Sequence, residues 1–437
     1  MLMKLKSILM EKEFRVKSTI IGIMLIILII TFFFASDIEN LLGLNSTYAK
    51  NEVSEESLTD SSFKVHYIDV GQGNSTFVEL PDGKTLLIDG GNTAYGKTVA
   101  DYLNERDVDV IDYLIATHAD SDHIGGLNYI FDEFEIVNIY RPFQIAGTGT
   151  TANTFVPDQN EDLASTYKTI VEQTGNRSKI SRVTSSIYRE FISNIYSETY
   201  TVNDMRISSN VTVFYDGLVI SGKNYSIEFF APFVRTMFSG LVDAKQTEGF
   251  ATEGYGASDS NGASAIFLLT CYDETFLFTG DAPWTSGSDG GDYEELDFVN
   301  SLSKSEIDKF NNVSVFLVGH HGSSHSSGEA LLNLINPKFA VISVGKDNTY
   351  GHPSSEVIFR LLQTDNLAFD YLLHTDQMGS ICFGEVAGKL RYVLEISTDM
   401  SKFNISWHEL STMLFLFVSV LIVSVKPKPY YKQFHWQ

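Results

Sequence analysis

The sequence predicts an α/β fold, a layered sandwich of two strand-rich halves that are each accompanied by helices. Three observations support this prediction. Short runs of alternating apolar residues, bounded by turn residues, recur over residues 63–117 and again over 265–344. Segments with helical spacing accompany both halves. A dense group of metal-binding residue types, at residues 118–123, directly follows a predicted strand, and the ends of strands are where functional groups gather on a rigid scaffold.

The first half is predicted to be a meander that leads into a helix and a further strand. Its expected elements are strands at 63–70, 75–80 and 84–89, a helix at 97–106 and a strand at 113–117. Residues 145–210 differ, because they are rich in Thr, Asn and Ser and then show helical spacing at 167–173 and 187–196. We interpret this stretch as an inserted helical cap.

The second half is predicted from apolar runs that follow a Gly/Ser-rich loop at 254–264. Its expected strands lie at 265–271, 275–280, 313–318 and 339–344. The only two cysteines, Cys271 and Cys382, stand in apolar runs and in no CxxC motif, which favours two buried thiols over a disulfide. With 437 residues, 43% of them hydrophobic, the chain can bury a large core.

The N-terminal segment predicts a membrane anchor. Residues 18–36 carry no charge, and nineteen such residues rise about 28 Å as a helix, close to the thickness of a bilayer core. Residues 1–17 form a basic tail, which favours a cytoplasmic N-terminus and an outward-facing domain. A cleaved signal peptide is the alternative interpretation.

The remaining boundaries follow from composition. Residues 37–62 are predicted to be an acidic linker, residues 63–398 the main domain, residues 410–425 a possible second span, and residues 426–437 a basic cytoplasmic tail. Removing the eight basic and two acidic residues of the two tails from the totals of 31 and 55 leaves the central part with a net charge near −30. Such a charge argues against broad, nonspecific binding to DNA.

The group at residues 118–123 predicts a metal site. His118, Asp120, Asp122 and His123 lie within six residues, directly before a Gly-Gly turn. Imidazole and carboxylate ligands suit Zn²⁺, or Mn²⁺ where oxygen ligands dominate. Carboxylates crowded in this way are costly unless a cation neutralises them.

Two later segments supply further candidates for the same chemistry. In residues 318–325 three histidines follow a predicted strand, and we expect His320 to bind metal while His321 contacts the substrate or acts as an acid, with the order of these roles open. The loop at 344–354 is rich in hydrogen-bond donors, and its His352 and Asn348 could hold a phosphate oxygen or protonate a leaving group.

Seven motifs occur in one order along the chain and together resemble one family. They are Tyr67–Ser75, Leu87–Gly91, His118–Gly126, Thr279–Asp281, Gly319–Ser323, Asn348–Ser354 and His374–Gly379. Their order over residues 63–396 resembles the extracellular metallo-β-lactamase-like domain of ComEC-type DNA-uptake proteins. The resemblance implies an αββα metallo-β-lactamase sandwich with a helical insert, here joined to one or two transmembrane helices.

The resemblance also implies roles for individual residues. Asp281 would bridge two metals, and Asp89 would orient a ligating imidazole. The first metal would then be held by His118, Asp120 and Asp281, and the second by Asp122, His123, Asp281 and His320. Ser323 and Asn348 would contact the substrate, and Asp122, His321 and His352 would take part in catalysis. The chain departs from the general metallo-β-lactamase signature because Asp120 stands where a second histidine is usual, and no histidine occurs between His123 and Asp281.

We therefore expect a membrane-anchored, extracellular hydrolase that uses one or two Zn²⁺ ions, or Mn²⁺, and cleaves a phosphodiester, with DNA as the substrate implied by the resemblance. The acidity of the central part leaves a second interpretation open, an esterase for phosphorylcholine on surface polymers. β-Lactam hydrolysis is less expected because the full histidine set is absent. A non-catalytic binding module with a decayed metal site is the third interpretation, suggested by Asp120.

Overall fold

The computed structural model describes residues 58, 61–142, 145–146, 182–183, 185–231, 260–284 and 294–395. The two predicted membrane spans, the two tails and most of the predicted linker lie outside these residues, as do the predicted helix at 167–173 and residues 254–259 of the predicted loop. Among the helices that are described, none has the length and apolar character needed to cross a bilayer.

The first sheet has eight strands in the order β10-β5-β4-β3-β2-β1-β18-β19. Strands β1, β2 and β3 form the predicted meander, and β3, β4 and β5 run parallel to one another. The last two strands of the chain return to this sheet, where β18 pairs with β1. The bounds are β1 (Lys64–Tyr67), β2 (Thr76–Glu79), β3 (Thr85–Ile88), β4 (Val110–Ile115), β5 (Glu135–Arg141), β10 (Asn210–Val213), β18 (Ser380–Val386) and β19 (Lys389–Glu395).

The second sheet has seven strands in the order β11-β12-β13-β14-β15-β16-β17. From β14 to β17 the neighbouring strands are parallel, so their carboxyl ends lie along one edge. The bounds are β11 (Val219–Gly222), β12 (Tyr225–Ala231), β13 (Ile266–Cys271), β14 (Glu274–Phe278), β15 (Val315–Leu317), β16 (Phe339–Ile342) and β17 (Leu372–His374). The strands predicted in this half are confirmed as β13, β14, β15 and β16.

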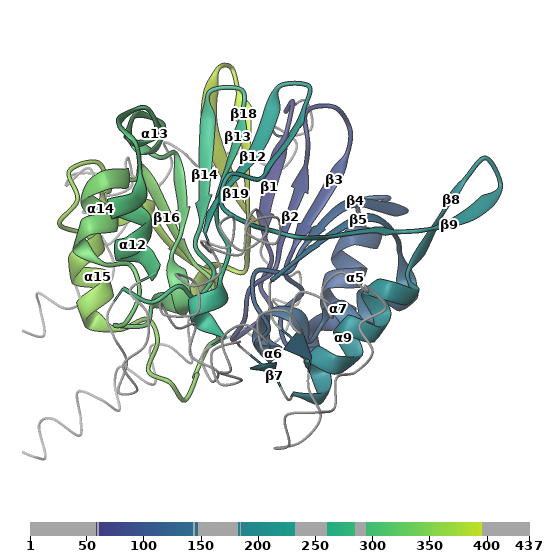
Figure 1. The fold of residues 1–437 in the computed structure, drawn as a ribbon. Coiled ribbons are helices and arrows are strands. Elements are labelled where there is room, and N and C mark those ends of the chain that lie inside the picture. The colour runs from purple at the N-terminus through teal and green to yellow at the C-terminus, as the bar shows by residue number, and fades with distance from the viewer. Residues whose placement is uncertain are drawn as a thin grey trace, which may run out of the picture. The chain divides into compact units, whose positions relative to one another are not determined.

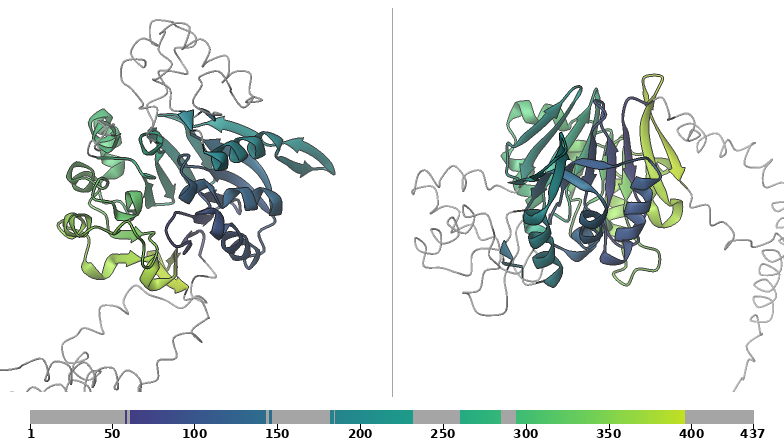
Figure 2. Two further views of the ribbon diagram at one scale, coloured as in Figure 1. Left: turned by 90° about the horizontal axis from the view of Figure 1, so that it is seen from below. Right: turned by 90° about the vertical axis from the view of Figure 1, so that its right-hand side faces the viewer.

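Helices cover the outer face of each sheet, so the layers run αββα as the resemblance implies (Figure 1). The first sheet is covered by α5 (Gly96–Asn104), α7 (Leu127–Glu133) and α9 (Ser186–Ser197), and the second by α12 (Glu294–Ser301), α13 (Lys304–Phe310), α14 (Glu329–Ile335) and α15 (Ser355–Leu361). The view from below in Figure 2 shows the two helical layers on opposite sides of the sheets.

Short elements complete the described part of the chain. Two of them are two-stranded ribbons, β6 (Ile145–Ala146) with β7 (Arg182–Val183), and β8 (Thr199–Val202) with β9 (Met205–Ser208). The short helices are α6 (Ser121–Ile124), α16 (Thr375–Met378) and the single turns η1 (Thr93–Tyr95), η3 (Asn261–Ala263), η4 (Gly319–Gly322) and η5 (Phe369–Tyr371).

Helix α9 lies within the predicted insert but packs in the outer layer of the first half. Its Tyr188, Phe191 and Ile192 are buried in the cluster that also holds residues of α5 and α7. Its apolar side chains recur at helical spacing, which is why the sequence predicted a helix here. Helix α9 of the insert thus contributes to the core, whereas strands β8 and β9 of the same insert are largely exposed.

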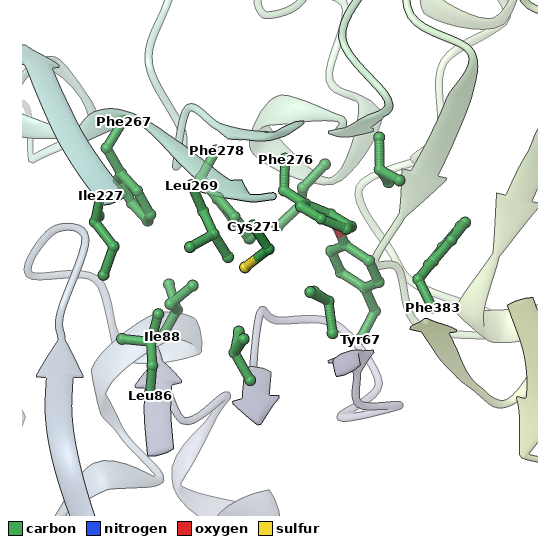
Figure 3. Close-up of a cluster of buried hydrophobic side chains, with 14 of the residues drawn as sticks. Tyr67, Leu86, Ile88, Ile227, Phe267, Leu269, Cys271, Phe276, Phe278 and Phe383 are labelled. Carbon is green, nitrogen blue, oxygen red and sulfur yellow. The ribbon is translucent and has the colours of Figure 1, made fainter. Parts of the chain in front are cut away.

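The main core lies between the two sheets and is rich in phenylalanine. Figure 3 shows Phe267, Phe276 and Phe278 of the second sheet facing residues of the first, with Cys271 among them. Phe267 and Phe278 stack with ring centroids 4.9 Å apart. Both cysteines are free and buried, as predicted, and burial raises the pKa of the Cys271 thiol to about 12. The Cys271 thiol is therefore un-ionised at neutral pH, and only the thiolate is a nucleophile.

Candidate metal centre

The two sheets deliver their polar side chains to a common edge. In the first sheet β3 and β4 are parallel, with Ile88 opposite Ile115, so Asp89 and His118 emerge from neighbouring strand ends. In the second sheet β14 and β15 are parallel, so Asp281 and His320 also follow neighbouring strand ends. Helix α6, which carries Asp122 and His123, lies at the lower edge of the sandwich in Figure 1. Residues far apart in the chain meet there because parallel strands end together.

Asp89 fixes the orientation of His123. The Asp89 Oδ2 atom accepts a hydrogen bond from His123 Nδ1 at 2.7 Å and another from Thr117 Oγ1 at 2.7 Å, while Oδ1 accepts from the Thr117 amide at 2.8 Å. Because the Thr117 hydroxyl proton is used on Asp89, its oxygen can accept from His118 Nδ1 at 3.1 Å. These hydrogen bonds fix the Nδ1 side of both imidazoles and leave Nε2 as the atom that could bind a cation.

Two glycine pairs lock α6 against the end of β3. The amide of Gly90 donates to the carbonyl of His123 at 2.7 Å, and the amide of Gly126 donates to the carbonyl of Gly91 at 2.8 Å. A Cβ atom on Gly126 would lie only 1.9 Å from the Gly90 oxygen, which no side chain could tolerate. The Gly-Gly sequences beside the predicted ligands thus hold the ligand-bearing turn at a fixed distance from Asp89.

Asp281 stands between all the histidines of the centre. Its Oδ1 lies 3.1 Å from His123 Nε2, and its Oδ2 lies 3.8 Å from His118 Nε2 and 3.6 Å from His320 Nε2. The Asp281 side chain is 3% exposed, and its backbone amide donates to Ser264 Oγ. Two groups have the spacing of metal ligands, His118 with His123 and Asp281, and Asp122 with His123 and His321.

The structure distinguishes the two adjacent histidines whose roles the sequence left open. His321 is buried, donates from Nδ1 to the Ser343 carbonyl at 2.9 Å, and places Nε2 3.3 Å from Asp122 Oδ2. His320 has a side chain that is 28% exposed and lines the cavity. Both residues have positive φ, 49° and 52°, a left-handed backbone that typically costs about 1–3 kcal/mol per residue and persists where function needs it.

Asp120 lies on the open side of the centre. Its side chain is 42% exposed, its Oδ2 lies 3.7 Å from His118 Nε2, and Ser260 donates a hydrogen bond to its Oδ1. Ser260 precedes η3 and Ser264 follows it, so this short segment holds Asp120 with one residue and the Asp281 backbone with another. The sequence predicted a Gly/Ser-rich loop here and assigned no ligand-holding role to either serine.

The centre passes a test of fit for a divalent cation. The Nε2 atoms of His118, His123 and His321 and the Oδ1 atom of Asp281 are buried and make no hydrogen bond within the described residues. Unpaired buried polar atoms are costly, and a cation accepting their lone pairs removes that cost. The donor set of imidazole nitrogens and carboxylate oxygens suits Zn²⁺ or Mn²⁺.

Histidines and carboxylates lie close together in the centre and shift one another's pKa values. Burial by itself raises the pKa of Asp281, but the adjacent histidine charges outweigh it and hold that pKa well below its usual range. Burial lowers the pKa of His123, yet the carboxylates of Asp281 and Asp89 raise it well above the ordinary value. Burial raises the pKa of Asp122, but His321, whose Nε2 lies 3.3 Å from Oδ2, and the charge of His123 outweigh burial and hold that pKa low. The carboxylates are therefore ionised and ready to bind a cation.

A cavity of about 350 Å³ opens onto the centre. It is lined by Gln72, Ala119, Asp120, Ser121, Asp122, Ser185, Asp281, His320, His321, Tyr350 and His352. His352 was predicted to lie at the site, whereas Gln72, Ser185 and Tyr350 were missed. Gln72 lies in the first of the seven motifs and Tyr350 in the sixth, but nothing in the sequence shows which residue of a loop faces a cavity.

The two predicted substrate contacts, Ser323 and Asn348, are not among the residues that line the cavity. Ser323 is buried, and its Oγ accepts from the His325 amide. The Asn348 amide is used within its own loop, where Nδ2 donates to the carbonyls of Gly345 and His352 and Oδ1 accepts from the His352 amide. Asn348 thus shapes the loop that carries His352.

Comparison with known proteins gives a family and several relatives. Residues 68–149 match the model of the metallo-beta-lactamase superfamily. The chain is 23% identical over 338 residues to ComE operon protein 3 of Bacillus subtilis, covering 74% of this chain and 33% of that protein. It is 31% identical over 126 residues to competence protein ComA of Neisseria gonorrhoeae, covering 29% of this chain and 16% of that protein.

The chain is a metallo-β-lactamase-fold protein similar to ComEC-type competence proteins. The resemblance inferred from the seven motifs is thereby confirmed. The chain spans about a third of the length of its Bacillus subtilis relative. Among solved structures, the metallo-beta-lactamase fold protein YhfI from Bacillus subtilis covers 76% of this chain and 99% of its own, with a TM-score of 0.34 and 11% identity.

Proposed function

We propose that this protein is a metal-dependent phosphodiesterase that acts on DNA outside the cell and is anchored in the membrane by residues 18–36. The observation that carries the proposal is the convergence of four buried, hydrogen-bond-free ligand atoms from His118, His123, His321 and Asp281. The similarity to metallo-β-lactamase-fold and competence proteins supports a metal-dependent hydrolase and a role in DNA uptake.

Each residue of the centre has a role in this proposal. Asp122, His123, His321 and Asp281 would hold one cation, and His118, Asp120 and Asp281 a second. Bound there, such cations supply an activated water and stabilise negative charge that develops on phosphorus. The placement of His321 among the buried ligand atoms favours it over His320 as the metal ligand, which reverses the order expected from the sequence.

The exposed histidines would act on the substrate itself. Burial, together with the charges of His320 and His321, lowers the pKa of His352 to about 4, so its imidazole is neutral at neutral pH. A neutral imidazole donates one hydrogen bond, and we propose that His352 holds a phosphoryl oxygen with it. Burial lowers the pKa of His320 as well, so this residue, which lies 3.6 Å from Asp281 and also lines the cavity, would act as a second neutral donor to a phosphoryl oxygen.

A second candidate is an esterase for a small cationic phosphodiester such as a phosphorylcholine ester. It is favoured by the charge of the cavity, because its lining among the described residues includes three aspartates and neither lysine nor arginine. A polyanion gains most of its affinity from such basic residues. A choline headgroup, in contrast, would be attracted by the acidic wall.

The first experiment measures metal and activity together. The purified full chain is analysed for bound Zn and Mn, and then assayed with bis-p-nitrophenyl phosphate, single-stranded DNA and p-nitrophenyl phosphorylcholine. We expect the wild type to hold stoichiometric metal and to cleave the first two substrates. Asp122→Ala should abolish the cleavage and lower the metal content. Asp132→Ala, on the exposed face of α7, should change neither. A wild-type chain without stoichiometric metal would favour a binding module and refute the hydrolase.

A separate experiment addresses the membrane topology. Protease added to intact cells should degrade the central domain while leaving cytoplasmic proteins whole. Protection of the central domain would contradict the outward-facing anchor.

A further inference from the structure

Tyr350 is an aromatic side chain displayed at the mouth of the cavity. It lines the cavity and is 71% exposed, so most of its surface is accessible to a ligand that enters the cavity. Its ring stacks on that of His352, with centroids 5.8 Å apart and planes 17° from parallel. The His352 ring in turn lies 5.7 Å from that of His320, so a row of rings leads from the candidate metal centre to the solvent.

The loop that carries Tyr350 is braced rather than loosely attached. The Asn348 side chain spans the loop through its three hydrogen bonds to Gly345 and His352. The Gly345 amide donates to Gln72 Oε1 at 3.2 Å, which ties the loop to the first half of the sandwich. The exposure of Tyr350 is therefore a consequence of a fixed backbone, and the ring is held in place before any ligand arrives.

The chemistry around Tyr350 indicates what could lie on it. A flat ring with one broad exposed surface fits another flat ring, and every nucleobase has such a face. A quaternary ammonium group is usually held by a cage of several rings, whereas only Tyr350 and histidines line this cavity among the described aromatic residues. Bases within a duplex are already stacked on one another, so only an unpaired base could use the platform.

We propose that Tyr350 is a stacking platform for an unpaired base next to the scissile phosphodiester, so that the site selects single-stranded nucleic acid over duplex. This inference rests on the proposed phosphodiesterase function and names a specificity-determining residue for it. Stacking supplies affinity that does not depend on basic side chains, which the cavity lining lacks.

Binding of oligonucleotides to the full chain tests this platform without relying on turnover. Fluorescence anisotropy would compare a labelled oligothymidylate, phosphorothioate-linked to slow its cleavage, with an abasic chain of the same length and linkage and with the matching duplex. Tyr350→Ala should weaken binding of the oligothymidylate by roughly 5- to 150-fold, as is typical of aromatic residues that stack on bases. It should leave binding of the abasic chain unchanged, and Tyr350→Phe should bind like the wild type.

Matched controls separate the platform from general effects. Phe359→Ala removes an aromatic side chain of α15 that is 64% exposed and lies outside the cavity lining, and it should change no affinity. Three outcomes would overturn the inference. Tyr350→Ala could lose equal affinity for the base-bearing and the abasic chain, or it could bind the oligothymidylate as the wild type does. The third outcome is a wild-type protein that binds no oligonucleotide. A Tyr350→Ala effect confined to p-nitrophenyl phosphorylcholine would also overturn it.

The outcome for the proposed function is read separately, from cleavage by the wild type. A chain that binds unpaired bases through Tyr350 but cleaves no phosphodiester would refute the enzyme and leave the platform standing. If Tyr350→Ala cleaves and binds phosphodiesters as well as the wild type does, the platform is refuted and the enzyme stands.

Discussion

The two sides of the candidate metal centre differ in how firmly their ligands are held. On one side His123 and His321 are buried and each has its Nδ1 fixed by an acceptor, Asp89 and the Ser343 carbonyl respectively. On the other side Asp120 is 42% exposed and is held by Ser260, a residue of a short polar segment. The two histidines of the first side are thus fixed inside the fold, whereas on the second side His118 is buried but Asp120 reaches the solvent.

This difference indicates that the aspartate at position 120, where a histidine is usual, affects only the exposed side of the centre. The carboxylate that stands in place of an imidazole lies on the exposed side, and on the buried side the Nε2 atoms of His123 and His321 have no hydrogen-bond partner among the described residues. We therefore expect one firmly bound cation and one that exchanges more readily. Four predictions test that contrast, beginning with the residue that both sides share.

Asp281→Asn should cause the largest loss, because Asp281 contacts both sides. Removing its charge leaves the buried histidines without their shared carboxylate, so both cations should be lost. Activity should fall well beyond the roughly 10–100-fold typical of residues that merely orient a ligand. Elemental analysis and kcat/KM measure the effect, and retention of one full equivalent of metal would show that the two sides are independent.

Asp122→Ala and Asp120→Ala should differ in which cation they lose. Asp122 belongs to the buried group with His123 and His321, so its loss should remove the firmly bound cation and abolish activity. Asp120→Ala should remove the readily exchanging cation and reduce activity less. Elemental analysis after treatment with a metal chelator distinguishes the two variants, because only Asp120→Ala should retain metal, and equal amounts of chelator-resistant metal in both would contradict the asymmetry of the centre.

Asp89→Asn should weaken the buried side without removing a ligand. The amide can still accept a hydrogen bond, but it loses the charge that orients His123, and such changes cost roughly 10–100-fold in metal affinity or activity. The matched control is Asp112→Asn, whose carboxylate accepts hydrogen bonds from Thr85 at the other end of β4. Isothermal titration with Zn²⁺ should show weakened binding only in the first variant.

The smallest expected effect is on stability and concerns Glu295, which holds the segment that follows His321. Its carboxylate accepts from the amides of Ser327 and Gly328 at 2.7 and 2.8 Å. Burial raises its pKa from 4.5 to about 7, although the two amides and the charge of Arg360 oppose the rise.

Because the folded state favours the protonated Glu295, the stability that this group contributes is complete below about pH 4.5 and is lost as the pH rises through 7. The shift corresponds to roughly 3 kcal/mol. The free energy of unfolding of the wild type, measured with urea, should therefore fall between pH 4.5 and 8 relative to that of Glu295→Gln, in which residue 295 does not titrate. Parallel curves for the two proteins would contradict a raised pKa.

Much of the fold could be predicted from the sequence because its elements carry local patterns. The meander of β1 to β3, helix α5 and the four strands β13 to β16 were expected from apolar alternation and turn residues within a few positions. Strand β18 was visible only as an apolar run around Cys382, and β19 was not expected; β18 pairs with β1 more than three hundred residues away, and β19 pairs with β18. No local pattern specifies such a partner, because the register of a sheet depends on the packed whole.

The candidate site divides in the same way. The sequence by itself determined that imidazoles and carboxylates follow strand ends, and that glycine pairs stand beside them, because these features depend on residue type and on neighbours in the chain. Only the tertiary structure decided that His321 joins the buried ligand atoms, that the Asn348 amide is used within its own loop, and that Tyr350 faces the cavity. These outcomes depend on where parallel strands from two sheets end in space, and that position is set by packing between residues distant in the sequence.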